Sequence, residues 1–415
     1  MSAFIATLAI GSVHGMLIAA VRLAARRLCA RPRSAVPPAE WPPVRVFLPF
    51  EGGSAELEAA LDDLAGQDYP DFDLCLAHLA TDAAAGNLAQ TWKRKQAARQ
   101  GPAIHIASSD AARSCGQKNQ NLLAALALPD PAKRVLVFTD ADYRRPPDWL
   151  RQLVEPVATG RAPVASGYYH AEAGAGWRSA LRPVTALLLF LTRQFTALRQ
   201  PWGGATAIPR RLFDELGIVE LWSTNVVDDV ALAERLRQAG LAVEGINAPA
   251  LRASVRPAEF PWGTWFTRQL AYLRAIQPGI WAGLGGGLWL LAASCLWMVG
   301  MILRAFLLPT SSVAQGSAGL ALLDGGLWIA LGLRLHAMHP CPGSRRNWLA
   351  AFFAFWGMAP VCHLRTALSR TIRWREVDYR VGRGGHVLAT SATPDSPPAT
   401  TPAATRPRPE PAPSP

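Results

Sequence analysis

Short apolar runs alternate with segments of helical periodicity through the middle of the chain, from Val44 to about Pro249. Most of the runs contain β-branched residues and end at polar residues or proline, as buried strands do. The expected strands are residues 44–48, 74–79, 103–107, 135–139, 164–169 and 205–208. The expected helices are residues 54–64, 118–128 and 229–238. Strands that alternate with helices predict an α/β domain built on a parallel sheet.

A longer apolar segment lies near the N-terminus, at residues 3–21. Its length is close to the roughly 20 residues that a spanning helix needs. Arginines follow it directly, namely Arg22, Arg26, Arg27, Arg31 and Arg33. A cleaved signal peptide carries its charges before the apolar run, so this segment is predicted to be a membrane anchor. The positive-inside rule then predicts a cytoplasmic location for the domain that follows.

Three further apolar segments occupy residues 280–308, 320–338 and 348–364. If all three crossed the membrane, the tail would lie outside the cytoplasm. The tail is rich in arginine, which favours the cytoplasmic side: Arg365, Arg370, Arg373, Arg375, Arg380 and Arg383. One segment is therefore expected to be re-entrant or interfacial, and residues 348–364, which Pro360 interrupts, are the best candidate.

Residues 180–198 are unusually apolar for a segment inside a soluble domain. Arginines flank and interrupt the segment: Arg178, Arg182, Arg193 and Arg199. One interpretation is a helix in the membrane interface, with its arginines reaching lipid headgroups. The other is an ordinary core helix, and the sequence leaves both open.

The chain is thus expected to divide into six parts. Residues 1–25 form the N-terminal anchor, residues 26–43 a basic, proline-rich linker, and residues 44–277 a cytoplasmic catalytic domain. Residues 278–368 form a C-terminal membrane region, and residues 369–388 a basic segment after it. Residues 389–415 are rich in Ala, Thr, Ser and Pro, and this composition predicts a disordered tail.

Composition agrees with a multi-pass membrane protein. Half of the 415 residues are apolar, and the formal net charge is +12. The arginines lie beside apolar segments and not in one basic block, which favours a membrane partner over a nucleic acid. The six cysteines are scattered without CxxC or zinc-like spacing, which argues against a disulfide framework or a structural metal.

The candidate chemistry centres on residues 134–142, with the sequence RVLVFTDAD. A buried strand ends here in two carboxylates at alternate positions, Asp140 and Asp142. Ligands of open α/β sheets bind beyond the carboxyl ends of the strands. Two such carboxylates can hold a hard divalent cation whose shell is completed by phosphate oxygens. Taken alone, the pair fits a solvated acidic turn equally well.

Seven ordered motifs resemble the membrane-anchored family 2 glycosyltransferases. The resemblance is closest to the ceramide glucosyltransferase-like branch, which includes hopanoid-associated enzymes. The motifs are VFLPFEGG, LAGQDYPDFDL, CGQKNQNLL, VFTDADYRRPPDWL, WGGATAIPRRLFDELG, VVDDVALAERLRQAGL and TRQLAYLR. The resemblance covers residues 44–274 and the later stretch TIRWREVDYRVGRGG.

The resemblance implies a GT-A (Rossmann-like) α/β domain that binds a nucleotide sugar, usually UDP-linked, with Mg²⁺ or Mn²⁺. Asp140 and Asp142 match the metal-binding D-x-D. Asp229 matches the catalytic base of an inverting transfer, with Asp228 beside it; alternatively, both acids only favour a helix N-terminus. The substrate-binding positions implied are Glu51, Asp82, Lys118, Asn121, Trp202, Gly203, Gly204, Arg268, Gln269 and Tyr272.

Two motifs depart from the family pattern. The acidic segment after the second strand retains only Asp82, slightly displaced. The (Q/R)xxRW motif has Ala271 and Tyr272 where the family has arginine and tryptophan. These departures put a ceramide acceptor in doubt but leave the donor-site acids in place.

The leading hypothesis is a bacterial inner-membrane enzyme that transfers a sugar to a lipid hydroxyl at the cytoplasmic leaflet. A polysaccharide synthase is a second reading, although it usually needs more spanning helices. A catalytically inactive, transferase-like membrane protein is a third. A P-loop or dinucleotide-binding protein is disfavoured because no GxxxxGKS or GxGxxG follows a strand.

Overall fold

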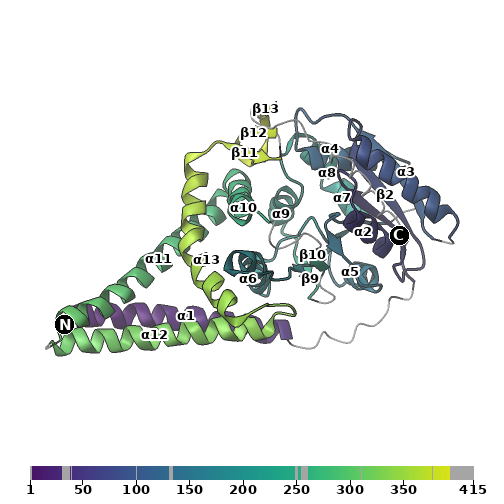
Figure 1. The fold of residues 1–415 in the computed structure, drawn as a ribbon. Helices are drawn as coiled ribbons and strands as arrows, with labels where there is room; N and C mark the ends of the chain where they lie inside the picture. The colour runs from purple at the N-terminus through teal and green to yellow at the C-terminus, as the bar shows by residue number, and fades with distance from the viewer. Residues whose placement is uncertain are drawn as a thin grey trace, which may run out of the picture.

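A computed structural model describes residues 2–29, 38, 40–99, 101–129, 134–247, 251–253, 260–309, 311–375 and 377–392. Half of the predicted linker, and the tail from residue 393 onward, lie outside the described residues. The described chain combines an α/β domain with long apolar helices that extend away from it (Figure 1).

A seven-stranded sheet forms the centre of the α/β domain, with strand order β3-β2-β1-β4-β8-β6-β9. The strands are β1 (Val44–Pro49), β2 (Phe72–Leu79), β3 (Ala103–Ser109), β4 (Val135–Phe138), β6 (Val164–Ser166), β8 (Thr206–Pro209) and β9 (Val243–Gly245). Strands β1 to β4 are parallel, but β8 runs antiparallel to β4 and β6. The expected parallel core of the sheet is therefore confirmed, with β8 as an antiparallel strand that the sequence did not indicate. A short apolar run does not encode strand direction, which depends on the path of the connecting chain.

The predicted strand at residues 164–169 is divided in the structure. Strand β6 ends at Ser166, and Tyr169–His170 forms β7 in a second, three-stranded sheet of order β5-β10-β7. Its other strands are β5 (Tyr143–Arg144) and β10 (Leu251–Ala253). The second sheet places Tyr143, the residue directly after the acidic pair, beside the end of the main sheet.

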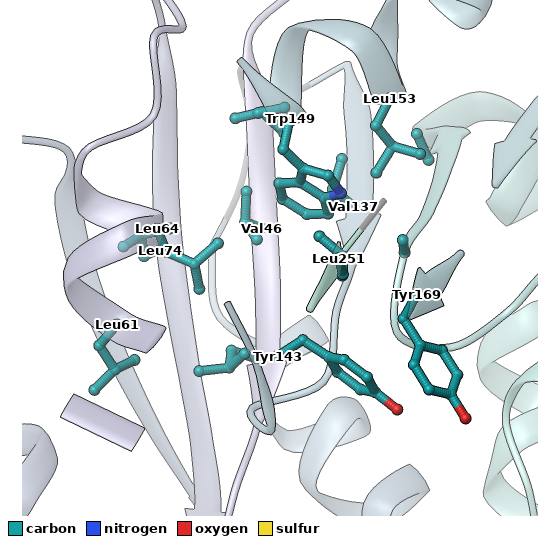
Figure 2. Close-up of a cluster of buried hydrophobic side chains, with 14 of the residues drawn as sticks. Val46, Leu61, Leu64, Leu74, Val137, Tyr143, Trp149, Leu153, Tyr169 and Leu251 are labelled. Atoms are coloured by element: carbon teal, nitrogen blue, oxygen red, sulfur yellow. The ribbon is translucent and has the colours of Figure 1, made fainter. Parts of the chain in front are cut away.

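Helices cover both faces of the main sheet because alternate strand residues point to opposite sides. One face packs on α2 (Ala55–Ala65), α3 (Ala83–Ala97) and α5 (Trp149–Ala158). The other packs on α4 (Gln117–Leu126), α7 (Arg210–Glu215), α8 (Ile218–Thr224) and α9 (Asp229–Gln238). Figure 2 shows the first core, where Val46 and Val137 of adjacent strands meet Trp149, while Tyr143 and Tyr169 lie side by side.

Three helices are long and apolar enough to cross a membrane: α1 (Ser2–Cys29), α11 (Pro278–Leu307) and α12 (Ser312–Met338). Helix α13 (Arg345–Leu368) is not among them, in line with the expectation that residues 348–364 do not span. It continues through Pro360 and runs across the direction of α1 and α12 (Figure 1). Three spans remove the topological conflict, because the arginine-rich segment then returns to the side of the α/β domain.

Helices α6 (Trp177–Thr192) and α10 (Trp262–Ile276) join the α/β domain to the apolar helices. Leu181, Val184 and Phe266 share one apolar core with residues of α1, α11, α12 and α13. Helix α6 is largely buried, and Arg182 and Arg193 lie inside the protein. Of the two interpretations left open, the structure favours the core helix, because Arg182 and Arg193 do not reach the surface.

A third sheet closes the described part of the chain. Its strands are β11 (Thr371–Trp374), β12 (Val377–Val381) and β13 (Val387–Ala392). Because β13 extends to Ala392, the expectation of disorder from residue 389 is wrong for residues 389–392. The sheet is attached to the α/β domain by a hydrogen bond from Val226 N to Gly385 O (3.0 Å). Gly385 has φ +83°, and a Cβ atom there would lie 2.3 Å from Asn225 Oδ1, so only glycine fits.

Polar side chains link the three candidate spans. His14 of α1 is within 2.8 Å of Asp324 Oδ2 of α12 through Nδ1, and within 2.7 Å of Ser294 Oγ of α11 through Nε2. His14 is 1% exposed. Polar side chains inside a membrane bundle fix the packing of its helices, because each would otherwise lie unpaired in hydrocarbon.

We therefore expect His14→Leu to lower the stability of the full chain in detergent by about 1–2 kcal/mol. The substitution removes both contacts and leaves Asp324 buried. Thermal unfolding followed by intrinsic fluorescence measures the effect. Ser12→Ala is the matched control, because Ser12 is exposed on the same helix and bonds only to Leu8 O. Equal melting temperatures for His14→Leu and the control would contradict the role of His14.

Candidate active site

A cavity of about 970 Å³ lies beyond the carboxyl ends of β1 and β4. It gathers most of the site residues expected from the sequence, although they come from distant parts of the chain. Those in its wall are Glu51, Lys118, Asn121, Asp140, Asp142, Trp202, Asp228, Asp229, Arg268, Gln269 and Tyr272. Asp82, Gly203 and Gly204 are not part of the wall, but Gly203 lies directly behind it.

The turn that carries Asp140 and Asp142 is held by buried hydrogen bonds. Arg145, which is 5% exposed, donates to Tyr143 O (2.6 Å), to Thr139 Oγ1 (2.7 Å) and to Asp140 O. Thr139 Oγ1 in turn donates to Gly204 O (2.8 Å). Antiparallel pairing of β4 with β8 places Phe138 opposite Thr206, so the acidic turn and residues 202–204 lie side by side. The two carboxylates are thereby presented at one fixed edge of the cavity.

Asp142 lies in an environment that opposes its charge. Burial, together with the neighbouring charge of Asp140, raises the pKa of Asp142 to about 6, against an opposing effect of Arg182. A cation bound by two neighbouring carboxylates offsets their mutual repulsion, and a ligand can complete its coordination. Arg182 offsets only part of the rise in the pKa of Asp142. Its guanidinium lies 4.0 Å from the centre of the Phe260 ring.

Lys118, in the first turn of α4, bridges the two acidic pairs. Its Nζ lies 2.7 Å from Asp140 Oδ1 and 2.9 Å from Asp228 Oδ2. Burial alone would lower its pKa, but the charges of Asp140, Asp228 and Asp229 raise the pKa of Lys118 above its ordinary value. Lys118 therefore stays charged and holds the metal-site candidates beside the catalytic candidates.

Asp228 and Asp229 differ sharply in environment although they are adjacent. Asp228 is 3% exposed and is paired with Lys118. Among the described residues, Asp229 has no cationic partner within hydrogen-bond distance, and it accepts from Gly203 N (3.2 Å) and Val230 N (2.8 Å). Burial and the charge of Asp228 raise the pKa of Asp229 to about 6. A carboxylate with this pKa is suited to accept a proton near neutral pH.

Glycine is required at position 203 for steric reasons. A Cβ atom there would lie 2.5 Å from Asp228 Oδ2 and 2.7 Å from Lys118 Nζ. Any side chain would therefore push apart the ion pair that joins the two acidic pairs. The WGG motif thus brings the backbone close to the carboxylates, and Gly203 N contributes a hydrogen bond to Asp229.

Two of the expected substrate-binding residues have structural partners. Asp82 caps α3, accepting from Ala85 N (3.0 Å), and also accepts from Gly52 N (2.7 Å). Asp82 therefore ties the start of α3 to the loop that contains Glu51 and is not itself part of the cavity wall. Asn121 is 2% exposed, and its Oδ1 accepts from Ser109 Oγ (2.6 Å) and Gln117 Nε2 (2.9 Å). It supports α4 at the edge of the cavity.

The cavity wall also includes residues that the sequence did not single out. They are aromatic or basic, and they come from β5, the loops and helices after β6, and the C-terminal sheet: Tyr143, Tyr168, Tyr169, Arg182, Arg193, Trp374, Arg375 and Tyr379. Arg375 forms an ion pair with Glu51, and Tyr379 Oη accepts from Gln117 N (3.3 Å). The repeated Arg/Trp/Tyr composition of the stretch TIRWREVDYR was the available signal for this part of the wall.

The carboxylates of the cavity wall are the side chains that could hold a divalent cation. No group of three His, Cys, Asp or Glu side chains is placed to hold a metal in the part of the chain that the structure describes. Asp140 and Asp142 are two oxygen donors on one cavity edge, and Asp142 is destabilised by its neighbour's charge. Mg²⁺ and Mn²⁺ commonly bind to one or two carboxylates, with substrate phosphates and water as the remaining ligands. The residues therefore fit a cation that arrives with a diphosphate.

Solved structures place the fold among known architectures. A mannosyltransferase from Pyrobaculum calidifontis, in complex with GDP-mannose and Mn²⁺, is 17% identical, with a TM-score of 0.52; the match covers 88% of this chain and 98% of that one. Glucosyl-3-phosphoglycerate synthase from Mycobacterium tuberculosis is 18% identical over 56% and 78% of the two chains, with a TM-score of 0.37. TarS from S. aureus is 13% identical over 85% and 99%, with a TM-score of 0.36. The first of these confirms the expected GT-A fold class.

Sequence comparison gives the family. A search of the curated proteins found no match. The model of Glycosyl transferase family 21, the ceramide glucosyltransferase family, matches residues 7–387. The expected resemblance to ceramide glucosyltransferases is confirmed at this level. Because the match spans nearly the whole chain, the protein belongs to glycosyl transferase family 21, whose members transfer sugars from nucleotide-sugar donors.

Proposed function

We propose that this glycosyltransferase moves a sugar from a UDP-linked donor to a hydroxyl group of a membrane lipid, with inversion at the sugar carbon. One observation carries the lipid part of the proposal. The wall of the cavity combines the two acidic pairs with residues of α6 and α10. These helices belong to the same apolar core as α1, α11 and α12, the candidate membrane spans. A lipid can therefore reach the acids from the bilayer without crossing water.

The donor diphosphate is proposed to bind beside Asp140 and Asp142. A bound Mg²⁺ or Mn²⁺ would offset the negative charge that develops on the departing diphosphate. Lys118 holds Asp140 in place and adds a positive charge near the same phosphates. The aromatic residues Trp202 and Tyr272 of the cavity wall offer faces for the sugar or nucleoside, and Arg268 and Gln269, on the same helix as Tyr272, can contact its polar groups.

Asp229 is proposed to be the general base. It takes the proton of the acceptor hydroxyl as the oxygen attacks the sugar carbon from the face opposite the leaving diphosphate. Asp228 positions this chemistry through Lys118 and raises the pKa of its neighbour. Ceramide and hopanoid lipids both carry hydroxyl groups of the kind required, and the altered residues Ala271 and Tyr272 leave the choice of lipid to experiment.

The proposal is tested with purified full-length protein, Mn²⁺ and a series of UDP-sugars. The acceptor is a total lipid extract in mixed micelles, and products are identified by mass spectrometry. A new glycolipid from one UDP-sugar supports the proposal. Transfer only to water-soluble sugars, or elongation to a polysaccharide, would contradict a lipid acceptor. The polysaccharide alternative is already disfavoured, because three candidate spans are few for a polysaccharide channel.

The rate of transfer should fall below about pH 6, because Asp229 acts only when deprotonated and burial raises its pKa to about 6. With a base of ordinary carboxylate pKa, the rate would not change with pH until about pH 4. The measurement is kcat/KM against pH at saturating Mn²⁺. Asp228→Asn removes the negative charge that raises this pKa, so its residual activity should persist to lower pH than that of the wild type. An unshifted acidic limb in this variant would contradict the assignment.

The α/β domain should face the cytoplasm, because Arg22, Arg26 and Arg27 follow the first candidate span. With three spans, the end of the chain lies on the same side. A reporter that fluoresces only in the cytoplasm should therefore be bright when fused after Arg274 or after Pro415. The same reporter fused after Arg304, at the end of α11, should be dark. Brightness at Arg304 with darkness at Arg274 would invert the topology and exclude a cytoplasmic UDP-sugar as donor.

A further inference from the structure

A second cavity, of about 960 Å³, lies beside the first and has a different lining. It is bounded by α10, the end of α13 and the C-terminal sheet. Its wall contains seven arginines: Arg268, Arg274, Arg365, Arg370, Arg373, Arg380 and Arg383. Among the described residues of this wall there is no carboxylate. The cavity is therefore strongly positive, and the site described above uses only Arg268 of this set.

These arginines are not compensated by the protein itself. None of the seven forms an ion pair with another residue in the described part of the chain. Arg274 donates to Thr366 O, which joins α10 to α13, but gains no negative partner there. Like charges gathered around one hollow repel each other, and an anion bound among them relieves that repulsion. Several guanidinium groups around one point suit a phosphate, which accepts paired N–H donors.

The position of the cavity indicates which kind of phosphate compound it would bind. Arg274 lies one helical turn before Pro278, the first residue of the candidate span α11. Leucines beside the arginines are exposed: Leu364 (46%), Leu368 (80%) and Leu388 (59%). Exposed leucines next to arginines are typical of a surface at the level of lipid headgroups, with the apolar side chains in the acyl region.

We propose that this cavity binds the phosphate headgroup of an anionic membrane lipid, at a site separate from the transfer site. The lipid would anchor α13 and the C-terminal sheet to the leaflet from which the acceptor enters. Thr264 and Arg268 line both cavities, so the bound headgroup lies next to the wall of the active site. The inference goes beyond the proposed function and does not depend on which sugar or acceptor is used.

The test measures binding of soluble, short-chain dihexanoyl phosphatidylglycerol to the detergent-solubilised full chain. The wild type should bind it at least about tenfold more tightly than dihexanoyl phosphatidylcholine, since each basic residue near an anionic headgroup adds a several-fold gain. The triple variant R370Q/R373Q/R380Q should lose this preference. The control variant K93Q/R94Q/R99Q removes the same charge from exposed positions on and just after α3, and should keep it.

Each result decides the proposal. Equal losses in the cavity variant and the control variant would overturn it, because general charge attraction would then explain the binding. Inorganic phosphate that binds as tightly as phosphatidylglycerol would assign the cavity to a free phosphate and overturn the lipid. UDP-sugar hydrolysis by the cavity variant should stay within about twofold of wild type, since none of the three arginines contacts the first cavity. If that variant fails to fold, the single variants R370Q and R380Q replace it, each with an expected loss of about threefold.

Discussion

Asp229→Asn should slow sugar transfer by about 10²–10⁴-fold, while UDP binds nearly as well as to the wild type. Asparagine keeps the size of the side chain and can still accept from Gly203 N, but it cannot take a proton from the acceptor hydroxyl. The metal and diphosphate are expected on Asp140 and Asp142, so donor affinity should be preserved. Single-turnover transfer rates and UDP titrations on the same preparation measure the two quantities.

Asp228→Asn is the matched control for this prediction. Its carboxylate is paired with Lys118, so the variant loses an ion pair and not a proton acceptor. We expect a smaller loss of rate together with weaker UDP binding, because Lys118 is no longer held between the acidic pairs. If Asp228→Asn abolished transfer while Asp229→Asn remained active, the base would be Asp228, one residue earlier.

The main sheet could be predicted well from the sequence, for a physical reason. The runs at residues 44–48 and 135–139 are apolar except for Arg45 and Thr139, and both form buried central strands in the structure. Helix α9 has the predicted bounds of residues 229–238, because acids favour its first residues and Gly240 follows its end with φ +68°. Local signals of this kind need no knowledge of the rest of the chain.

The other parts of the site depend on contacts between distant segments. The sequence leaves the position of Arg182 open, because a sequence pattern cannot distinguish an arginine facing lipid headgroups from one that lies over Phe260 near Asp142. Tyr379 and Arg375 complete the cavity wall only because the C-terminal sheet docks against Asn225 and Val226. Such docking over more than 150 residues of chain has no local signature in the sequence.

Asp142→Asn should reduce metal-dependent transfer by about 10²–10³-fold, the range found when one group that stabilises developing charge is removed. The same substitution should not weaken the fold. Burial and the charge of Asp140 raise the pKa of Asp142 to about 6. At pH 7 its ionised form is therefore less favourable in the folded protein than in the unfolded protein. Neutral asparagine relieves this repulsion, and we expect the metal-free variant to be more stable than the wild type by about 1–2 kcal/mol.

Added Mn²⁺ and UDP should reverse this order of stability. If Asp140 and Asp142 hold the cation, its binding should stabilise the wild type, whereas the variant has lost one of these two carboxylates. Melting temperatures with and without Mn²⁺ and UDP, followed by removal of the metal with EDTA, separate the two contributions. Asp214→Asn is the control, because Asp214 is an exposed carboxylate on α7 outside the cavity. An Asp142→Asn protein that is stabilised by Mn²⁺ and UDP as strongly as the wild type, and that transfers sugar at full rate, would place the metal elsewhere.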